Sequence, residues 1–375
     1  MRRVGILYGR GCENNLYASN TLVPLLRWRR ALRDAGIMLV FSNRIVPRIL
    51  DCEVILVIDY FDVPDGAVPG GREAGILATL GSNGNKIVYF DNADSCGTTQ
   101  FELIEHVDRY LKKQVYRDRG LYRRHVYSLR RYCEFYHERF GIDDPENERV
   151  RPLPGEHAHK LMVGWHGGMG PYGLSNRILR KANELNYALG LPIKAQAVRD
   201  MGEIVFGPRG RVAWPRKRYD IHYRLYIGHA LNTIAFARGR AREILAGLGG
   251  GYDVRTGAPV GRREYLREMR LSRVVVSPFG YGEICRRDFE AFLCGAALVK
   301  PSLDHLETWP DVFRAGETYA PYAWDFADLP AVLEDLLRSG RAKEIAENGR
   351  NNYLSTISGT GKTNFIQRFS HLTTF

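Results

Sequence analysis

The chain has 375 residues, of which 45% are hydrophobic and 26% are charged. This composition is typical of a folded globular protein with room for two domains, and it excludes a disordered or fibrous chain. The 54 Lys and Arg residues outnumber the 42 Asp and Glu residues, which gives a formal charge of +12 and favours anionic partners such as phosphates, nucleotides, nucleic acid or an acidic membrane surface.

The N-terminal sequence MRRVGILYGRGCE contains only a short apolar run before Gly, Arg and Glu, so we do not expect a signal peptide. No stretch approaches the roughly 18 apolar residues of a spanning helix. The six cysteines form no CxxC pair, which argues against a zinc ribbon or a disulfide framework. We therefore expect a cytoplasmic protein with free thiols, whose basic charge also allows peripheral contact with a membrane.

The first half alternates apolar runs with amphipathic ones. We expect strands at 4–8, 37–41, 54–58 and 87–90, and a helix at 21–35. Near-continuous apolar strands separated by helices indicate a parallel sheet with both faces covered. A helix-rich, aromatic and basic stretch follows Phe101, and a polar, proline-marked segment from Asp143 to Pro154 ends this half. We predict an N-terminal Rossmann-like domain over residues 1–150.

The second half repeats this alternation. The expected elements are a strand at 161–165, a helix at 231–248, a strand at 274–278, a helix at 283–294, a strand at 296–299 and helices from 329 to 375. We predict a C-terminal Rossmann-like domain over residues 151–350 and a helical tail over 351–375 that returns to the first domain. The fold class is therefore α/β, with two Rossmann-like domains facing each other across a cleft.

The clearest chemical signal is the strand, loop and helix around residues 274–294. Gly280 and Gly282 give a tight loop, and the helix after it begins near Arg286 and Arg287. A helix N-terminus beside guanidinium groups at the carboxyl edge of a parallel sheet is where phosphates bind. Glu290, one turn further on, can accept hydrogen bonds from a ribose. The alternative is an i,i+4 surface pair of Arg286 and Glu290, with glycines that serve only the turn.

The motifs Ser277-Pro278-Phe279-Gly280-Tyr281-Gly282-Glu283, Arg287-Asp288-Phe289-Glu290-Ala291 and Gly295 to Pro301 resemble the donor-binding region of glycosyltransferases with the GT-B fold. The similarity is greatest to the CgeB-like and exostosin-like groups. It implies that Glu290 binds the donor ribose and that Arg287 holds the phosphates. Many retaining members carry an E-x7-E pair, but Gly282 stands eight positions before Glu290, so retaining stereochemistry is not implied.

Further donor-site candidates follow from the same region. Glu283 closes the glycine loop, Lys300 ends the next strand, and His305 and Thr308 lie in the loop after it. If the sheet order is as expected, these residues share one edge of the cleft, and Lys300 meets a phosphate. The alternatives are a solvated lysine at a strand end and a structural histidine.

In the first half, Gly9 and Gly11 follow the first strand, but Asn14 stands where the third glycine of a dinucleotide fingerprint would be. The GT-B resemblance implies that this loop faces the cleft. An inverting transferase needs one base to take the acceptor proton. Our candidates are, in order, Asp94, Glu13 and His166, and a structural role is the alternative for each.

These observations favour a transferase that uses a nucleotide sugar as its donor, with an acceptor that the sequence does not identify. We expect no cofactor and no metal, because a helix N-terminus and Arg287 can neutralise the leaving diphosphate and no persuasive DxD motif is present. Two alternatives stay open. One is a GT-B relative, such as an epimerase, that acts on the nucleotide sugar itself. The other is a nucleic-acid-binding protein that uses the Arg- and Tyr-rich segment 117–139.

Overall fold

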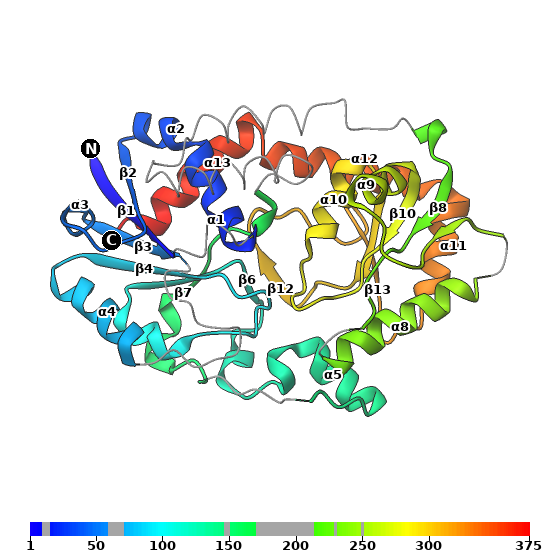
Figure 1. The fold of residues 1–375 in the computed structure, drawn as a ribbon, viewed down its shortest axis with the longest axis horizontal. Coiled ribbons are helices and arrows are strands. Elements are labelled where there is room, and N and C mark those ends of the chain that lie inside the picture. The colour runs from blue at the N-terminus through cyan, green and yellow to red at the C-terminus, as the bar shows by residue number, and fades with distance from the viewer. Residues whose placement is uncertain (10–15, 59–70, 146–150, 170–213, 229–230, 249–250) are drawn as a thin grey trace.

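A computed structural model describes residues 1–9, 16–58, 71–145, 151–169, 214–228, 231–248 and 251–375. It contains two parallel sheets, each covered by helices, that lie side by side along the longest axis (Figure 1). This is the two-domain α/β architecture expected from the sequence.

The first sheet has six parallel strands in the order β2-β1-β3-β4-β5-β7. Its strands are β1 (Arg2–Tyr8), β2 (Ile37–Ser42), β3 (Val54–Ile58), β4 (Lys86–Asp91), β5 (Arg109–Lys112) and β7 (Leu161–Val163). Successive residues of β1 face opposite sides, with Ile6 in one core and Leu7 in the other. Both faces are apolar because both are covered. The covering helices are α1 (Leu16–Arg27), α2 (Arg29–Asp34), α3 (Pro47–Leu50) and α4 (Gly71–Ser82).

The strands expected at 4–8, 37–41, 54–58 and 87–90 are confirmed as β1 to β4. The strand expected at 161–165 exists as β7, but it pairs with β5 in the first sheet and does not open the second. The first sheet therefore continues past the boundary expected at residue 150. The stretch after Phe101 holds β5, α5 (Arg131–Phe140) and short 3₁₀ helices. These are η2 (Phe101–His106), η3 (Arg119–Arg123) and η4 (Tyr127–Leu129), while η5 (Gly155–Lys160) and η6 (Gly167–Met169) flank β7.

The second sheet has five parallel strands in the order β13-β11-β10-β8-β9. Its strands are β8 (Tyr219–His222), β9 (Val254–Arg255), β10 (Ser272–Val276), β11 (Ala297–Pro301) and β13 (Ala320–Tyr322). The 3₁₀ helix η8 (Trp214–Arg216) precedes it. The helices of this half are α8 (Asn232–Ala246), α9 (Arg262–Leu271), α10 (Arg286–Cys294), α11 (Leu329–Ser339) and α12 (Arg341–Thr356). Phe289 and Phe292 of α10 are buried, as their helical spacing predicts.

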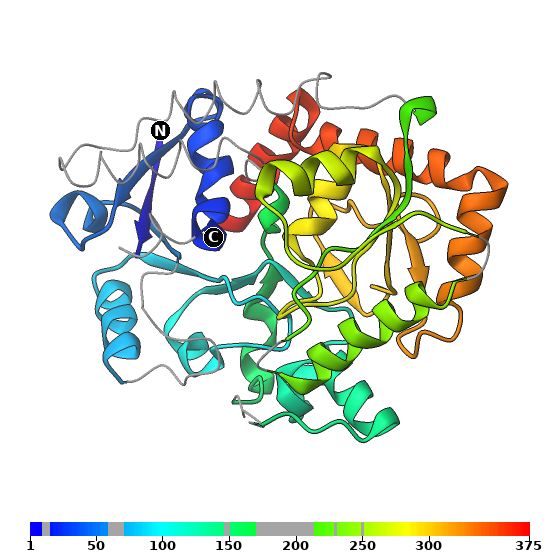
Figure 2. The same cartoon turned by 45° about the vertical axis from the view of Figure 1, so that its right-hand side comes forward.

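The last helix, α13 (Gly359–Thr373), returns to the first domain, as the sequence predicts (Figures 1 and 2). Phe365 lies 5.0 Å from the ring of Trp28 and 5.3 Å from that of Trp165. At the end of the helix, Arg2 donates to the carbonyl of Thr373 at 2.9 Å. The C-terminal helix thus completes the core on one face of the first sheet.

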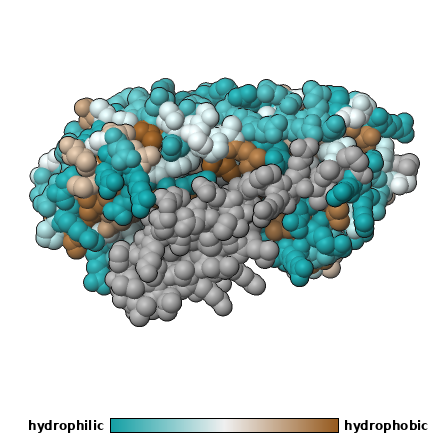
Figure 3. Space-filling model, turned by 90° about the horizontal axis from the view of Figure 1, so that it is seen from above, coloured by the Kyte–Doolittle hydropathy of each residue, from teal (hydrophilic) through white to brown (hydrophobic). Residues whose placement is uncertain are grey.

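The surface seen from above is mainly hydrophilic where it is described, and its apolar areas are small and separate (Figure 3). Among the described helices, none combines the length and the apolar character that crossing a membrane requires.

Candidate active site

The carboxyl ends of the two sheets meet. β6 (Gln114–Tyr116) follows β5 directly, and β12 (Leu306–Thr308) follows β11 after a short loop. These strands pair in antiparallel fashion between the two halves, with Gln114 opposite Thr308 (Figure 1). Loops at the carboxyl edge of a parallel sheet are where open α/β folds bind ligands. The junction between the halves is therefore the candidate ligand-binding region.

The glycine loop of the second half lies in this junction. A Cβ atom on Gly282 would lie only 2.1 Å from the backbone oxygen of Asp94, so only glycine permits this approach. The carbonyl of Gly280 accepts a hydrogen bond from the Tyr132 hydroxyl at 2.7 Å, and that of Tyr281 accepts one from Arg130 Nε at 2.8 Å. The loop is thereby fixed by residues that precede the second half, a role that the sequence did not suggest for Arg130 and Tyr132.

Helix α10 starts at the end of this loop. Cys285 is its N-cap, and the carboxylate of Asp288 accepts from the Cys285 backbone N–H at 2.7 Å, which closes a capping box. Asp288 also accepts from the hydroxyl of Ser277 and from Lys300 Nζ, the latter at 3.1 Å. Lys300 has no exposed surface, so its ammonium serves this buried network and we withdraw it as a phosphate ligand.

Arg287 and Arg238 lie against the same loop. Arg287 donates from Nε to Ser277 Oγ and from Nη2 to the Pro278 carbonyl, both at 3.0 Å. A Cβ atom on Gly280 would lie 3.2 Å from Arg238 Nη2. Burial and the neighbouring Arg287 guanidinium lower the pKa of Arg238. Neither guanidinium forms an ion pair with a carboxylate in the part of the chain that the structure describes.

Two adjacent guanidiniums without an acidic partner are suited to binding an anion. Arg238 donates to the Tyr226 carbonyl at 2.8 Å, and the hydroxyl of Tyr223 donates to the Arg238 carbonyl at 2.6 Å. The sequence allows Arg238 and Arg240 to contact a phosphate, but the interpretation that it favours for both is a solvated helix face. It holds for Arg240, whose side chain is 51% exposed and pairs with Glu243 at 3.3 Å, but not for Arg238.

Glu290 is buried and already paired. Its Oε1 lies 3.0 Å from Arg286 Nε and 2.5 Å from Arg262 Nη2. The expected i,i+4 pair is present, but it is not a surface pair, since the Glu290 side chain is only 4% exposed. The helix N-terminus of α9 brings Arg262 to this pair. A ribose would therefore have to share Glu290 with these two arginines.

The structure brings Glu283 and His305 together, with the Glu283 side chain and both ring nitrogens of His305 buried. Glu283 is fully buried, and Oε1 accepts from the Ser95 hydroxyl at 2.7 Å while Oε2 accepts from the Cys96 backbone N–H at 3.1 Å. Burial lowers the pKa of His305 to about 4, so its ring is neutral at pH 7. Thr308 lies in β12 and is partly exposed.

The three candidate bases have different surroundings. Asp94 lies beside the glycine loop, is 27% exposed, and pairs with Lys113 at 3.1 Å. His166 is enclosed: Nδ1 accepts from the Gly168 N–H at 3.1 Å, and Nε2 donates to the Pro310 carbonyl at 3.1 Å. Burial lowers the pKa of His166 to about 4. Because both of its ring nitrogens are occupied, His166 cannot take an acceptor proton, and this prediction is wrong.

The loop after β1 is only partly described. Gly9 is buried at the end of β1, where its N–H donates to the Ile58 carbonyl at 3.2 Å. Gly11 and Glu13 lie outside the described residues. Asp91 at the end of β4 is not a cleft group, because it is 2% exposed and accepts from Lys112 at 2.8 Å.

The tyrosine side chains of the basic aromatic segment 117–139 mostly face the interior of the protein. Tyr122, Tyr132 and Tyr136 are buried, so their rings cannot stack on bases. Several arginines of the segment are bound within the protein. Arg117 donates to the Asp304 carbonyl at 3.1 Å, and Glu134 lies 2.7 Å from Arg124. This arrangement favours the packing interpretation over the nucleic-acid one.

Comparisons with known proteins find no matching family model and no matching curated protein. Solved structures are similar over nearly the whole chain at low identity. HepE of Anabaena in complex with UDP-glucose is 11% identical, with 99% of this chain and 100% of that chain covered and a TM-score of 0.39. A glycosyltransferase from Rickettsia africae ESF-5 is 9% identical, with 99% and 98% covered and a TM-score of 0.42. S. aureus MnaA with UDP is 9% identical, with 99% and 96% covered and a TM-score of 0.42.

Proposed function

We propose that this protein is a glycosyltransferase that moves a sugar from a nucleotide-sugar donor to a hydroxyl acceptor. The proposal rests on Arg238 of α8 and Arg287 of α10, whose guanidinium groups lie against the glycine loop before α10. Among the described residues, no carboxylate forms an ion pair with either of them. A diphosphate supplies the negative charge that this pair lacks. The resemblance of residues 277–301 to CgeB-like and exostosin-like donor regions supports the same assignment.

The donor would lie on the second half, with its diphosphate on the α10 N-terminus and the two arginines. Helix N-termini and guanidiniums stabilise the negative charge that develops on a leaving diphosphate, without a metal ion at the phosphates. Arg287 Nε and Nη2 are held by the loop, which fixes the guanidinium before the donor arrives. A guanidinium that is already fixed in position stabilises the charge of a transition state more effectively than one that must first reorient.

The acceptor would lie on the first half, where Asp94 is our proposed base. Asp94 follows β4 and lies beside Gly282 of the glycine loop, and its side chain is partly exposed to solvent. A carboxylate across the junction from the diphosphate would take the proton of an acceptor hydroxyl. Glu290 remains our candidate for the donor ribose, next to Arg262 and Arg286.

A thermal-shift panel of nucleoside diphosphates tests the proposal. A ligand at 100 times its Kd stabilises the folded state by about 2.7 kcal/mol. We expect one diphosphate series to stabilise the wild type and to lose its effect in Arg238→Ala. Arg240→Ala is the matched control, since it removes an exposed arginine from the same helix. A shift from nucleic acid alone, or equal shifts in both variants, would contradict the proposal.

A further inference from the structure

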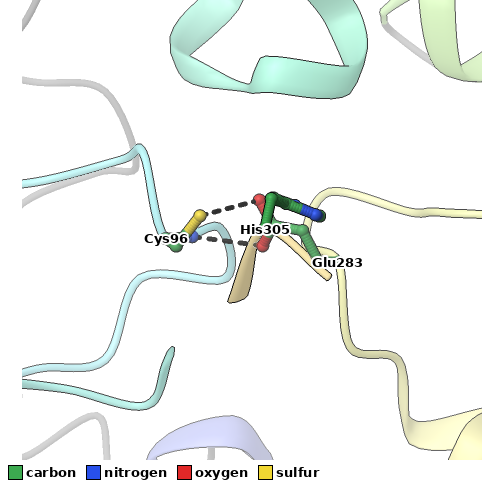
Figure 4. Close-up of side chains that lie close together, drawn as sticks. All are labelled: Cys96, Glu283 and His305. Carbon is green, nitrogen blue, oxygen red and sulfur yellow. Dashed lines mark hydrogen bonds between the residues drawn. The ribbon is translucent and has the colours of Figure 1, made fainter. Parts of the chain in front are cut away.

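Three side chains with metal-binding atoms meet where the halves join. Cys96 follows β4, Glu283 precedes α10, and His305 precedes β12. The Cys96 sulfur, a Glu283 oxygen and a His305 ring nitrogen all lie within 4.8 Å of one another. Figure 4 shows the thiol and the backbone nitrogen of Cys96 directed at the Glu283 carboxylate, with the His305 ring beside it. Residues far apart in the sequence thus form one compact cluster.

The carboxylate of this cluster belongs to Glu283. Glu283 accepts hydrogen bonds from Ser95, from the backbone and thiol of Cys96, and from Gln114 Nε2 at 3.4 Å. Within the described residues, no lysine or arginine forms an ion pair with it. A fully buried carboxylate without a counter-ion is costly, because hydrogen bonds from neutral groups offset only part of its lost hydration.

The second notable group of the cluster is the imidazole of His305. Both ring nitrogens of His305 are buried, and neither has a hydrogen-bond partner among the described residues. The ring is surrounded by aromatic groups, with Trp324 at 4.9 Å, Tyr116 at 6.3 Å and Phe279 at 6.4 Å between ring centres. Buried polar groups are nearly always paired, so an unpaired imidazole beside an uncompensated carboxylate points to a ligand between them.

We propose that Cys96, Glu283 and His305 bind one zinc ion, which joins the two halves of the protein. Thiolate, imidazole and carboxylate are the ligands that zinc takes, whereas magnesium prefers oxygen alone. On binding, the Cys96 thiol would lose its proton to solvent, and the thiolate and the carboxylate would together neutralise the divalent charge. None of these three residues is among the arginines proposed to bind the diphosphate, and the role of the zinc is to hold the glycine loop against the first half.

The metal content of the wild type gives the first test. After purification without chelator we expect about one zinc per chain. After its removal, added Co²⁺ should give a thiolate-to-cobalt charge-transfer absorption and release a proton. Absence of bound zinc together with absence of that absorption would overturn the proposal. Neither readout depends on nucleotide binding, so failure here is distinct from failure of the proposed function.

Variants give the second test. Cys96→Ser and His305→Gln should abolish the charge-transfer absorption or weaken zinc affinity by at least about 100-fold, since even changes to residues behind metal ligands cost 10- to 100-fold. Cys52→Ser is the matched control. Cys52 is also a buried thiol of the first half, 2% exposed, but it donates to the Arg48 carbonyl at 3.3 Å, away from the cluster. Equal affinity in all three variants would refute the assignment of ligands.

Discussion

Replacing Arg287 by alanine separates a role in catalysis from a role in the fold. The substitution removes two hydrogen bonds of 3.0 Å, to Ser277 Oγ and to the Pro278 carbonyl. Hydrogen bonds from a charged donor contribute about 1.5–3 kcal/mol each when buried. Because Arg287 is partly exposed, we expect the free energy of unfolding to fall by about 1–3 kcal/mol in total. The fold should therefore survive.

Turnover should fall much further. Removing one preorganised hydrogen-bond donor that stabilises a developing negative charge lowers the rate by about 10²- to 10³-fold, which corresponds to about 2.7–4 kcal/mol. Arg287→Lys should restore turnover only partly, since an ammonium supplies charge without the two-pronged geometry of the guanidinium. The two effects differ in kind, so measuring both stability and rate distinguishes them.

The assay is kcat/KM for nucleoside diphosphate release from the donor, measured well below the melting temperature of each variant. Arg240→Ala controls for the general loss of positive charge, because Arg240 is half exposed and pairs with Glu243. If Arg287→Ala turned over at the wild-type rate and only its melting temperature fell, Arg287 would be a residue of the fold and the proposed site would be wrong.

Three further predictions concern other residues. Asp94→Asn should lower turnover by about 10²- to 10⁴-fold while donor affinity, measured by calorimetry, stays unchanged; weaker donor binding at an unchanged rate would remove Asp94 as the base. Glu290→Gln should weaken nucleotide binding by about 1.5–3 kcal/mol and also lower the free energy of unfolding, because Arg262 and Arg286 lose their partner; calorimetry showing unchanged affinity would exclude the ribose contact. Burial lowers the pKa of His166 from about 6.5 in the unfolded chain to about 4 in the folded one, so its share of the free energy of unfolding falls by about 2 kcal/mol on acidification to pH 5. The pKa of buried His222 is lowered in the same way, so the total loss in the wild type should exceed this share; denaturant unfolding at pH 7 and pH 5 should show a loss smaller by about 2 kcal/mol in His166→Gln, and equal losses in the two proteins would exclude His166 as a source.

The sequence predicts the long apolar strands because their pattern needs no tertiary information. The residues of Val54–Ile58 and residues 274–276 are all apolar and buried, and such runs indicate strands by themselves. The sequence does not predict the strands β5, β6 and β12, because each spans only three or four residues and carries charged or polar side chains. Pairing with a neighbouring strand stabilises them, and this pairing leaves no hydropathy pattern in the sequence. The sheet to which β7 belongs depends on pairing with β5, which no local pattern shows.

The candidate site was predicted only in part, because the sequence shows local motifs but not tertiary contacts. The glycine loop and Arg287 follow from a local motif, and the structure brings them to the junction. Lys300 and His166 were mistaken for cleft groups, since a strand end or a glycine-flanked position does not reveal burial. Cys96 carried no signal, because its partners Glu283 and His305 are nearly 200 positions away or further in the chain.

We propose that the protein cleaves a nucleotide sugar and passes the sugar to an acceptor hydroxyl. The most direct measurement is release of nucleoside diphosphate, with identification of the sugar product, from a panel of nucleotide sugars in the presence of EDTA. We predict release from one nucleotide series, with transfer or hydrolysis of the sugar, that Mg²⁺ and Mn²⁺ do not increase; a loss of release in EDTA that Zn²⁺ alone restores would come from the Cys96 cluster and would leave the diphosphate site without a metal. No release from any donor with or without added Zn²⁺, an altered nucleotide sugar with its diphosphate still attached, or activity that only Mg²⁺ or Mn²⁺ restores would contradict the proposed metal-independent transfer.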